Sequence, residues 1–369
     1  MKDLFSSYRS ASDSKTEAGP DKIRAGDGSL WSLADAKTSP SPRSLRSRPW
    51  GLWRYREVLP DAPEDYVGLG EGGTPLVPLT LGRARFDAKV EYMSPTGSFK
   101  DRGAAVMLAV AASWGVDRCA VDSSGNAAAA VAAYAAFFGM RCDVFVPTAN
   151  SPSKLAQPSM HGAEVHRIDG SRADVAQAAM AFVEGSDAFY ASHVYCPFFY
   201  EGTKTYAYEI WEQLGGRAPD SIVLPVGNGT LVLGAAKGFR ELRAAGCIDR
   251  LPRIVAVQAA ACAPLASAWE EGSETVAGCD AGETAAEGIA IAAPPRGDEI
   301  LRAVRETDGE IMTVSDSAVR DARAQLARRG FFVETTAAVS AAALLQRPDL
   351  CGEGRSVVVP LCGSGLKGG

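Results

Sequence analysis

Histidine is scarce in this 369-residue chain, which has only three, and none of its eight cysteines belongs to a CxxC or similar metal-binding pair. We therefore expect no metal site, because protein sites for zinc and related ions are built mainly from these residue types. The cysteines stand singly in apolar or Ala-rich surroundings, from Cys119 to Cys362. This distribution is typical of reduced, mostly buried thiols and argues against a disulfide framework.

Long hydrophobic runs and an excess of basic residues are also lacking. No apolar run reaches the about 18 residues that a membrane span needs, and the nearest, Ala127–Phe138, is short and Ala-rich. The net charge of -6 argues against a nucleic-acid or anionic-membrane partner, since phosphates attract a basic surface. Residues 1–14 are polar and charged, unlike a signal peptide. We expect a soluble cytoplasmic protein.

The chain does have enough apolar residues for a large core, at 46% of the total. Its length indicates two domains or one large α/β unit, at roughly 100–200 residues a domain. Residues 1–49 are polar, and we expect this segment to be partly flexible, with a mobile linker over 37–48. The aromatic cluster of Trp50, Trp53 and Tyr55 favours a segment packed on the main body over a ligand site.

Beyond residue 90, strand-like apolar runs alternate with Ala-rich helical segments. Strands are predicted at 118–122, 142–147, 164–168, 221–226, 253–258 and 356–361. Helices are predicted at 102–114, 126–138, 171–184, 201–214, 231–245, 316–328 and 336–345. Alternation at this spacing predicts parallel sheets covered by helices. The polar, Gly-rich stretch 267–283 is expected to be a surface excursion.

Three loops stand out because each follows a strand or extended segment and opens a helix, which is where ligands bind in open α/β sheets. The first, SPTGSFKDRG, holds Lys100 where helix N–H dipoles favour the neutral amine that a Schiff base requires; an exposed loop lysine is the plainer alternative. The second, SSGN at 123–126, would also fit a substrate carboxylate, but a helix N-cap is favoured. The third, GNGTL at 227–231, suits a single phosphate, because it lacks the P-loop lysine and the dinucleotide spacing. A fourth turn, after the C-terminal strand, holds Cys362 and Ser364.

Together these loops resemble those of the fold-type II pyridoxal-phosphate enzymes, and specifically the threonine synthase family. The motifs GEGGTPL, SPTGSFKDRG, SSGNAAAA, EGTKTYAYEI, PVGNGTL and CGSGLK occur in the family's order, from Trp50 to Lys367. The resemblance implies an α/β fold of the tryptophan synthase β type, with two open parallel or mixed-sheet domains that carry helices on both faces. It further implies a homodimer, with the cofactor between a large cofactor-binding domain of residues 50–100 and 201–369 and a small mobile domain of residues 101–200.

The resemblance also implies roles for individual residues. Lys100 would form an aldimine with pyridoxal 5'-phosphate and then move protons at the α and β carbons of the substrate. Asn126 would hydrogen-bond the pyridoxal 3'-oxygen, and Cys362 would face the pyridine nitrogen, where the family usually has Thr or Ser. The backbone N–H groups that would hold the cofactor phosphate are those of Gly227, Asn228, Gly229, Thr230 and Leu231. The residues implied in substrate binding are Ser123, Ser124, Gly125, Thr96, Phe199 and Glu334.

Residues 192–205 depart from the family pattern, in which an Asn-rich stretch ends in NP-x-R before EG-x-KT. Phe199 stands at the position of that arginine, which binds the substrate phosphate in the family, while His193 and Cys196 replace asparagines. An aromatic ring cannot replace a guanidinium at a dianion. The aromatic run 195–200 therefore favours a less charged substrate arm, with a core-packed loop as an equal alternative. The family's Cys-containing N-terminal piece, and any zinc there, has no counterpart.

We therefore expect a carbon–oxygen lyase or β-replacement synthase that removes or replaces a β or γ substituent of an amino acid. A thiol at Cys362 is no carboxylate, so it does not force protonation of the ring nitrogen, which suits elimination and replacement better than transamination. Threonine synthase proper, which converts O-phospho-L-homoserine and water to L-threonine and phosphate, is the first alternative. A non-catalytic binding module of the same fold is another, and a nucleotide-binding protein is disfavoured by the missing Walker lysine. Glu287 and Glu334 match acidic positions near the family's cofactor, with helix capping as the alternative.

Overall fold

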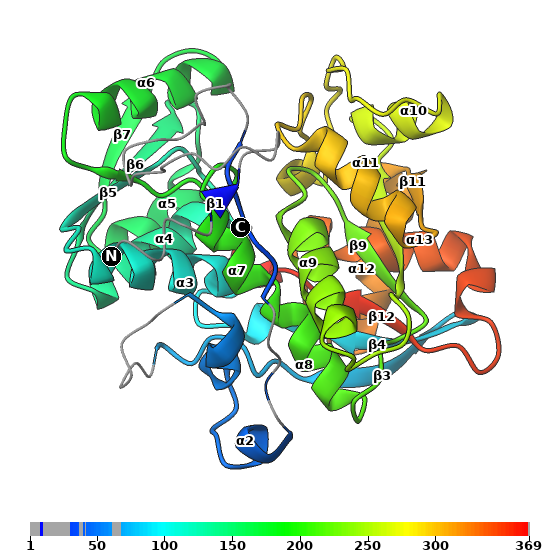
Figure 1. The fold of residues 1–369 in the computed structure, drawn as a ribbon. Helices are drawn as coiled ribbons and strands as arrows, with labels where there is room; N and C mark the ends of the chain where they lie inside the picture. Colours follow the sequence, from blue (N-terminus) through cyan, green and yellow to red (C-terminus); the bar gives the residue numbers. More distant parts are fainter. Residues whose placement is uncertain (1–7, 10–29, 37–39, 41, 61–67, 368–369) are drawn as a thin grey trace. The chain divides into compact units, whose positions relative to one another are not determined.

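The chain divides into two compact units by its internal contacts. The computed structural model describes residues 8–9, 30–36, 40, 42–60 and 68–367 (Figure 1). Unit 1 comprises Met1–Gly72 and Ser94–Thr203, and unit 2 comprises Gly73–Met93 and Lys204–Gly369. Of the segment 50–100, only residues 73–93 therefore group with the C-terminal part of the chain. The division into a large domain and a small mobile domain remains a prediction.

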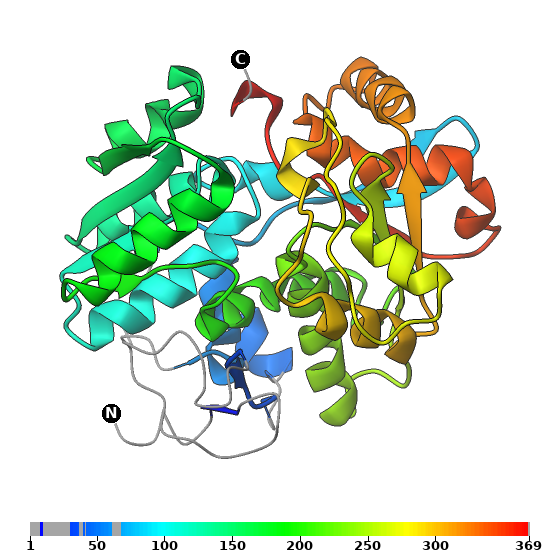
Figure 2. The same cartoon turned by 90° about the horizontal axis from the view of Figure 1, so that it is seen from above.

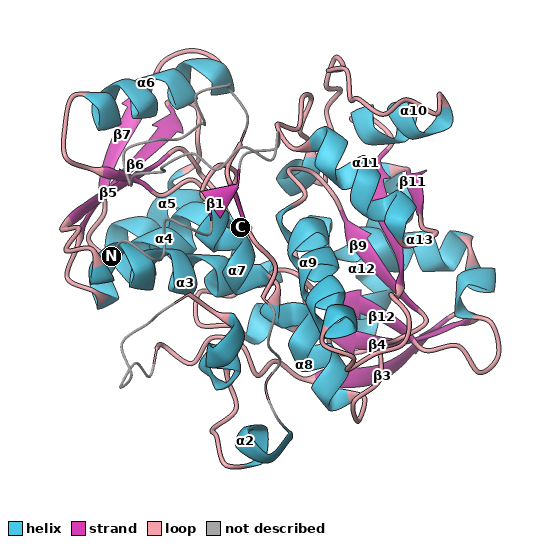
Figure 3. Cartoon of the chain, viewed as in Figure 1, coloured by secondary structure: helices cyan, strands magenta, loops and turns pink. Residues whose placement is uncertain are grey.

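Unit 1 contains a four-stranded, all-parallel sheet in the order β7-β6-β5-β8. One face packs against the Ala-rich helices α3 and α4 in a large apolar core that α5 and α7 share. Helix α6 covers the other face (Figures 1 and 3). The elements are α3 (Lys100–Ser113), β5 (Arg118–Val121), α4 (Asn126–Phe137), β6 (Arg141–Pro147), α5 (Pro152–Met160), β7 (Glu164–Ile168), α6 (Arg172–Glu184), β8 (Phe189–Tyr190) and α7 (Pro197–Thr203).

Alanine explains how α3 and α4 occupy the centre of unit 1. Residues 101–111 and 127–135 are buried without interruption. Alanine favours helix formation and takes little space, so two helices can be enclosed on all sides. Such helices have no polar face, and their chemistry is confined to their ends, where Lys100 and Asn126 are the first residues.

Unit 2 contains a six-stranded sheet in the order β11-β10-β9-β12-β4-β3. All neighbours are parallel except the antiparallel pair β3 and β4, and helices cover both faces (Figure 2). The strands are β3 (Leu76–Leu81), β4 (Ala84–Lys89), β9 (Ser221–Pro225), β10 (Arg253–Ala259), β11 (Glu310–Val314) and β12 (Val357–Pro360). The helices are α8 (Thr205–Gln213), α9 (Thr230–Ala244), α10 (Pro264–Glu270), α11 (Gly297–Glu306), α12 (Asp316–Arg328) and α13 (Val339–Gln346), with short 3-10 turns η2 (Glu91–Met93), η3 (Glu287–Ile289), η4 (Thr335–Ala338), η5 (Pro348–Cys351) and η6 (Gly365–Lys367).

The N-terminal segment differs from the linker predicted over 37–48. Helix α2 (Pro42–Arg46) forms there, and Leu45 is buried. The Arg54 guanidinium donates to the Leu45 carbonyl at 2.7 Å, which ties α2 to the 3-10 helix η1 (Leu52–Val58). Within the aromatic cluster Tyr55 is buried and Trp50 is exposed, so only part of it packs on the body. A two-residue antiparallel pair, β1 (Tyr8–Arg9) with β2 (Ser32–Leu33), is the only other strand pairing of this segment within the described residues. Within 1–49, residues 1–7, 10–29, 37–39 and 41 lie outside them.

The predicted strands are confirmed, each within one residue of its predicted ends. The helix predicted at 201–214 is wrong as a single element, because the structure has two helices, α7 and α8, separated at Lys204. The helix predicted at 336–345 begins as the 3-10 turn η4 before α13, and the expected excursion at 267–283 begins inside α10. Elements without a prediction include α5, α11, β11 and β4. None of the helices in the described ranges is long and apolar enough to cross a lipid bilayer.

Candidate active site

In unit 1, a buried carboxylate fixes the loop that precedes Lys100. The Thr96 N–H donates to Asp101 Oδ2 at 2.8 Å and the Thr96 hydroxyl to Asp101 Oδ1 at 2.6 Å. Asp101 and Thr96 are both buried, and charge-assisted bonds of this kind are strong where water is excluded. The loop therefore presents Lys100 at the first position of α3 in a defined place. The Thr96 hydroxyl serves the loop, and its implied contact with substrate stays a prediction.

Aromatic rings line the Lys100 amine. Its Nζ lies 4.3 Å from the centre of the Phe99 ring and 5.7 Å from that of Phe199. The Phe199 side chain is fully buried against α3, where a Cβ on Gly103 would come within 2.4 Å of its ring. Phe198 and Phe199 belong to the main core of unit 1. For these two residues the core-packed alternative is confirmed, although Phe199 still faces the lysine.

His193 is buried beside the same ring. Its imidazole lies edge-on to Phe199, with ring centres 5.9 Å apart. Burial holds the pKa of His193 well below its usual range, and the positive charges of Lys100 and Arg172 lower it further. The imidazole is therefore neutral at physiological pH.

The SSGN loop joins β5 to α4 without the side-chain cap that its sequence favoured. Gly125 occupies the N-cap position of α4, and no side chain makes a capping bond there. The Ser123 hydroxyl instead accepts the Gly125 N–H at 3.3 Å. The side-chain cap favoured for the Ser and Asn of this loop is therefore wrong, because Gly125 takes the cap position. This leaves the helix N-terminus suited to an anion such as a carboxylate.

Beside this loop, Tyr190 at the end of β8 donates its hydroxyl to Asp122 Oδ1 at 2.7 Å. β8 and β5 are neighbouring parallel strands, so their carboxyl ends share one sheet edge. Burial raises the pKa of Asp122, which the Tyr190 hydrogen bond and the Arg172 charge oppose. This edge is the place at which parallel sheets commonly bind ligands.

In unit 2, the GNGTL loop connects β9 to α9 as a tight glycine turn. Gly229 is the N-cap of α9, with φ of 77° in the left-handed region that favours glycine, and no side chain caps the helix. A Cβ on Gly229 would lie 2.3 Å from Ile300 Cδ1, and one on Gly227 would lie 2.8 Å from Ile289 Cα. The loop thus packs where only glycine fits, at the start of a 15-residue helix whose N-cap is a glycine. A glycine turn of this kind at a helix start is suited to a phosphate.

The remaining implied residues of unit 2 follow β12. Cys362 is buried, with its Sγ 3.9 Å from the Pro360 carbonyl oxygen. The Glu334 carboxylate packs on Gly363, where a Cβ would come within 2.3 Å of it. Glu334 stands at the N-cap of η4 but makes no side-chain capping bond, and Glu287 lies inside η3 rather than at its cap. Side-chain capping therefore accounts for neither carboxylate.

Sequence reasoning missed the buried polar groups that hold the motifs in place. Lys89 and Glu209 form a fully buried ion pair at 2.7 Å, and Lys89 Nζ also donates to the Thr74 carbonyl at 2.6 Å. The Gly73 N–H donates to Glu209 Oε1 at 2.7 Å. The GEGGTPL and EGTKTYAYEI motifs thus meet in unit 2, and Glu209 serves the fold. A glutamate within the fully buried stretch of α8 was the available signal, since such a charge needs a partner.

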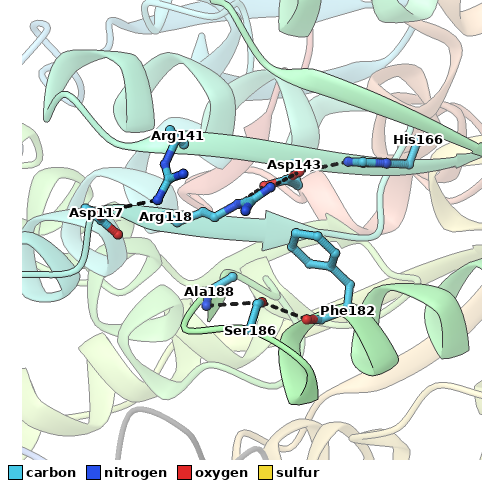
Figure 4. A network of polar contacts seen from close by, with 8 residues as sticks. All are labelled: Asp117, Arg118, Arg141, Asp143, His166, Phe182, Ser186 and Ala188. Atoms are coloured by element: carbon cyan, nitrogen blue, oxygen red, sulfur yellow. Dashed lines mark hydrogen bonds and ion pairs between the residues drawn. The ribbon is translucent and has the colours of Figure 1, made fainter.

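A second polar network lies on the sheet of unit 1 (Figure 4). Arg118 donates to both Asp143 oxygens, at 2.8 and 3.0 Å, and His166 Nε2 lies 2.8 Å from Asp143 Oδ1. Burial alone would raise the pKa of Asp143, but these hydrogen bonds and charges lower it. Glu164 completes a group of three possible metal ligands, yet the Asp143 carboxylate is already occupied by Arg118. The network is therefore an ion-pair cluster of the fold.

Comparison with known proteins decides the family. The model of the family described as pyridoxal-phosphate dependent enzyme matches residues 67–363. The chain belongs to this family. It is 36% identical to the threonine synthase of Methanosarcina acetivorans over 313 residues, covering 83% of this chain and 77% of that one. It is 37% identical to the threonine synthase of Mycobacterium tuberculosis over 323 residues, covering 85% of this chain and 87% of that one.

Solved structures agree with this pyridoxal-phosphate enzyme fold. A threonine deaminase from T.th. superposes with a TM-score of 0.69 at 28% identity, covering 79% of this chain and 92% of that one. A maize serine racemase gives 0.69 at 22% identity, covering 79% and 88%, and this likeness concerns the fold alone. The expected fold class, the cofactor and the threonine synthase-like character of the enzyme are confirmed.

The structure also fits the cofactor. The Gly227–Gly229 backbone forms a cradle in which a Cβ would clash, at a helix start with no side-chain cap. Lys100 is held at a helix start between aromatic rings. A primary amine and a phosphate cradle are the two groups that an aldehyde-bearing phosphate ester needs.

Proposed function

We propose that this pyridoxal-phosphate enzyme removes or replaces a β or γ substituent of an amino acid, with Lys100 as its catalytic residue. The observation that carries the proposal is the placement of the Lys100 amine, fixed by Asp101 and lined by Phe99 and Phe199. Lys100 accepts the proton from the substrate's α carbon and returns a proton after the substituent has left. The bound cofactor supplies an electron sink that stabilises negative charge at that carbon.

In this proposal the cofactor is held by residues of the motif loops. The N–H groups of the GNGTL loop bind its phosphate, from Gly227, Asn228, Gly229, Thr230 and Leu231. Asn126, the first residue of α4, hydrogen-bonds its 3'-oxygen, and Lys100 holds its aldehyde carbon. Cys362, which is buried, faces its ring nitrogen as a weak partner that is no carboxylate. This environment favours elimination and replacement over transamination.

The substrate carboxylate binds at the start of α4, to the SSGN loop residues Ser123, Ser124 and Gly125. The absence of a side-chain cap at Gly125 supports this assignment, because the helix dipole favours an anion there. Thr96, Phe199 and Glu334 complete the substrate contacts in the proposal.

Threonine synthase proper is the second candidate, favoured by the 35–37% identity to proteins of that name. In that reaction O-phospho-L-homoserine and water give L-threonine and phosphate. The discriminating experiment measures phosphate release from O-phospho-L-homoserine, and 2-oxo acid formation from L-serine and L-threonine, by purified cofactor-loaded protein. Turnover of one of these that is lost in Lys100→Ala supports the proposal.

The identity of the active substrate separates the two candidates. Phosphate release with threonine formed selects threonine synthase, and 2-oxo acid formation selects an eliminase. No turnover of these substrates or of O-acyl-serines by a protein that retains its cofactor favours a binding module instead.

We also propose a cytoplasmic homodimer that acts on a small amino-acid substrate without a nucleic-acid or membrane partner. The acidic net charge of -6 supports the absence of a polyanionic partner. Sedimentation velocity of the purified protein tests the dimer.

A further inference from the structure

His193 stands at the same sheet edge as the SSGN loop. It follows β8, whose parallel neighbour β5 runs directly into that loop. Ligand-binding groups gather where the carboxyl ends of adjacent parallel strands meet. Tyr190, three residues before His193, already reaches Asp122 across this edge.

His193 and Lys100 are linked through one aromatic ring. The imidazole lies edge-on to Phe199 at 5.9 Å between ring centres and an interplanar angle of 66°. The same ring lies 5.7 Å from Lys100 Nζ. Because Phe199 is fully buried and packed on Gly103, both groups are held in fixed relation to it.

The imidazole is uncharged, and the charged groups near it account for this. Burial lowers the pKa of His193 most, and the charges of Lys100 and Arg172 add to the effect. The Arg172 charge also lowers the pKa of Asp122, so Arg172 influences both residues at this sheet edge. A neutral imidazole offers one donor and one acceptor, which matches a hydroxyl or ester oxygen. A neutral imidazole adds no positive charge of the kind that favours a phosphate dianion.

We propose that His193 is a specificity-determining residue that hydrogen-bonds an uncharged oxygen substituent on the side chain of the amino-acid substrate. The site then selects a hydroxyl or acyl-ester substituent over a phosphate ester. This inference rests on the proposed function and names the class of its substrate.

The test compares kcat/KM of the cofactor-loaded protein for L-threonine, O-acetyl-L-homoserine and O-phospho-L-homoserine. We expect kcat/KM for the better of the two uncharged substrates to exceed kcat/KM for the phosphate ester by roughly tenfold or more. His193→Leu, which removes both hydrogen-bonding groups, should lower kcat/KM for the uncharged substrate by about tenfold to a hundredfold. It should lower the weak rate on the phosphate ester by a smaller factor, and so reduce the selectivity.

Two further variants separate recognition from structure. His193→Asn keeps a donor and an acceptor and should recover part of the selectivity, which a loss through misfolding would not allow. His161→Leu makes the same change at an exposed histidine after α5 and should leave the selectivity unchanged.

The inference is overturned if the wild-type protein prefers the phosphate ester, or if His193→Leu leaves the selectivity ratio unchanged. Either result leaves the proposed function intact as long as turnover still depends on Lys100. Loss of the Lys100 dependence itself would instead overturn the proposed function.

Discussion

Asp101 shows how one carboxylate determines the position of the side chain proposed to be catalytic. It receives two hydrogen bonds from Thr96 in a buried setting, and the adjacent Lys100 depends on the turn that these bonds close. The sequence motif predicted the lysine, but not that its neighbour would organise the loop. A carboxylate next to a reactive lysine carries no local signal of where it points.

We predict that Asp101→Asn destabilises the protein by about 2 kcal/mol, because two bonds to a buried charge are weakened and an amide N–H opposes the Thr96 donor. Thr96→Val is the matched control, since it removes only the hydroxyl bond and should cost less. Urea unfolding with a fitted midpoint measures both. Equal losses in the two variants would contradict the role of the backbone N–H bond.

His193 gives the protein a pH dependence of known sign. Its pKa is lowered in the folded state by burial, Lys100 and Arg172, so the unfolded chain binds more protons once the pH falls below about 6.5. The contribution of His193 to the free energy of unfolding is therefore fully present above that pH. It decreases as the pH falls toward the folded-state pKa, by at most about 1.4 kcal/mol for each pH unit.

The prediction is that His193→Asn loses less stability between pH 7.5 and pH 5.5 than the wild-type protein does. Urea unfolding at the two pH values measures the difference. An unchanged decrease in the variant would show that His193 is not held neutral in the folded state.

At the scale of elements, α9 offers a matched pair of glycines. Gly229 before the helix and Gly246 after it have φ of 77° and 70°, so alanine meets a similar backbone cost at each, about 1 kcal/mol or more. A Cβ on Gly246 meets nothing within 4 Å, whereas one on Gly229 meets the buried Ile300 at 2.3 Å. Only Gly229 belongs to the proposed phosphate cradle.

We therefore predict a larger loss of stability for Gly229→Ala than for Gly246→Ala. We also predict a weaker affinity for pyridoxal phosphate by about tenfold or more in the first variant alone, because the displaced loop no longer directs its N–H groups at the phosphate. Thermal unfolding and equilibrium dialysis measure the two effects. Equal cofactor affinity in both variants would rule out the proposed cradle.

Elements with a strong local pattern were predictable, and those that depend on distant partners were not. The run SIVLP and the Ala-rich helices 100–113 and 126–137 lie where their composition indicates. Helix α5 was missed because Pro158 stands inside it, and a proline normally argues against a helix. β11 was missed because EIMTV is short and partly exposed, and its pairing with β10 is what forms it.

At the scale of the whole chain, the sequence predicted an alternating α/β protein and the order of its motifs. The family resemblance placed residues 50–100 with the C-terminal part of the chain, and of these residues 73–93 group with unit 2. That assignment follows from the pairing of β4 with β12, two strands more than 260 positions apart. Pairing at such a separation leaves no local pattern to detect.

Reduction of the cofactor-loaded protein with borohydride, followed by peptide mass spectrometry, tests the central claim most directly. A Schiff base between a lysine and pyridoxal phosphate becomes a stable secondary amine on reduction. We predict that the pyridoxyl group is found on the peptide that contains Lys100, and that Lys100→Ala acquires none. A pyridoxyl group on another lysine, or none at all in the wild-type protein, would contradict the account.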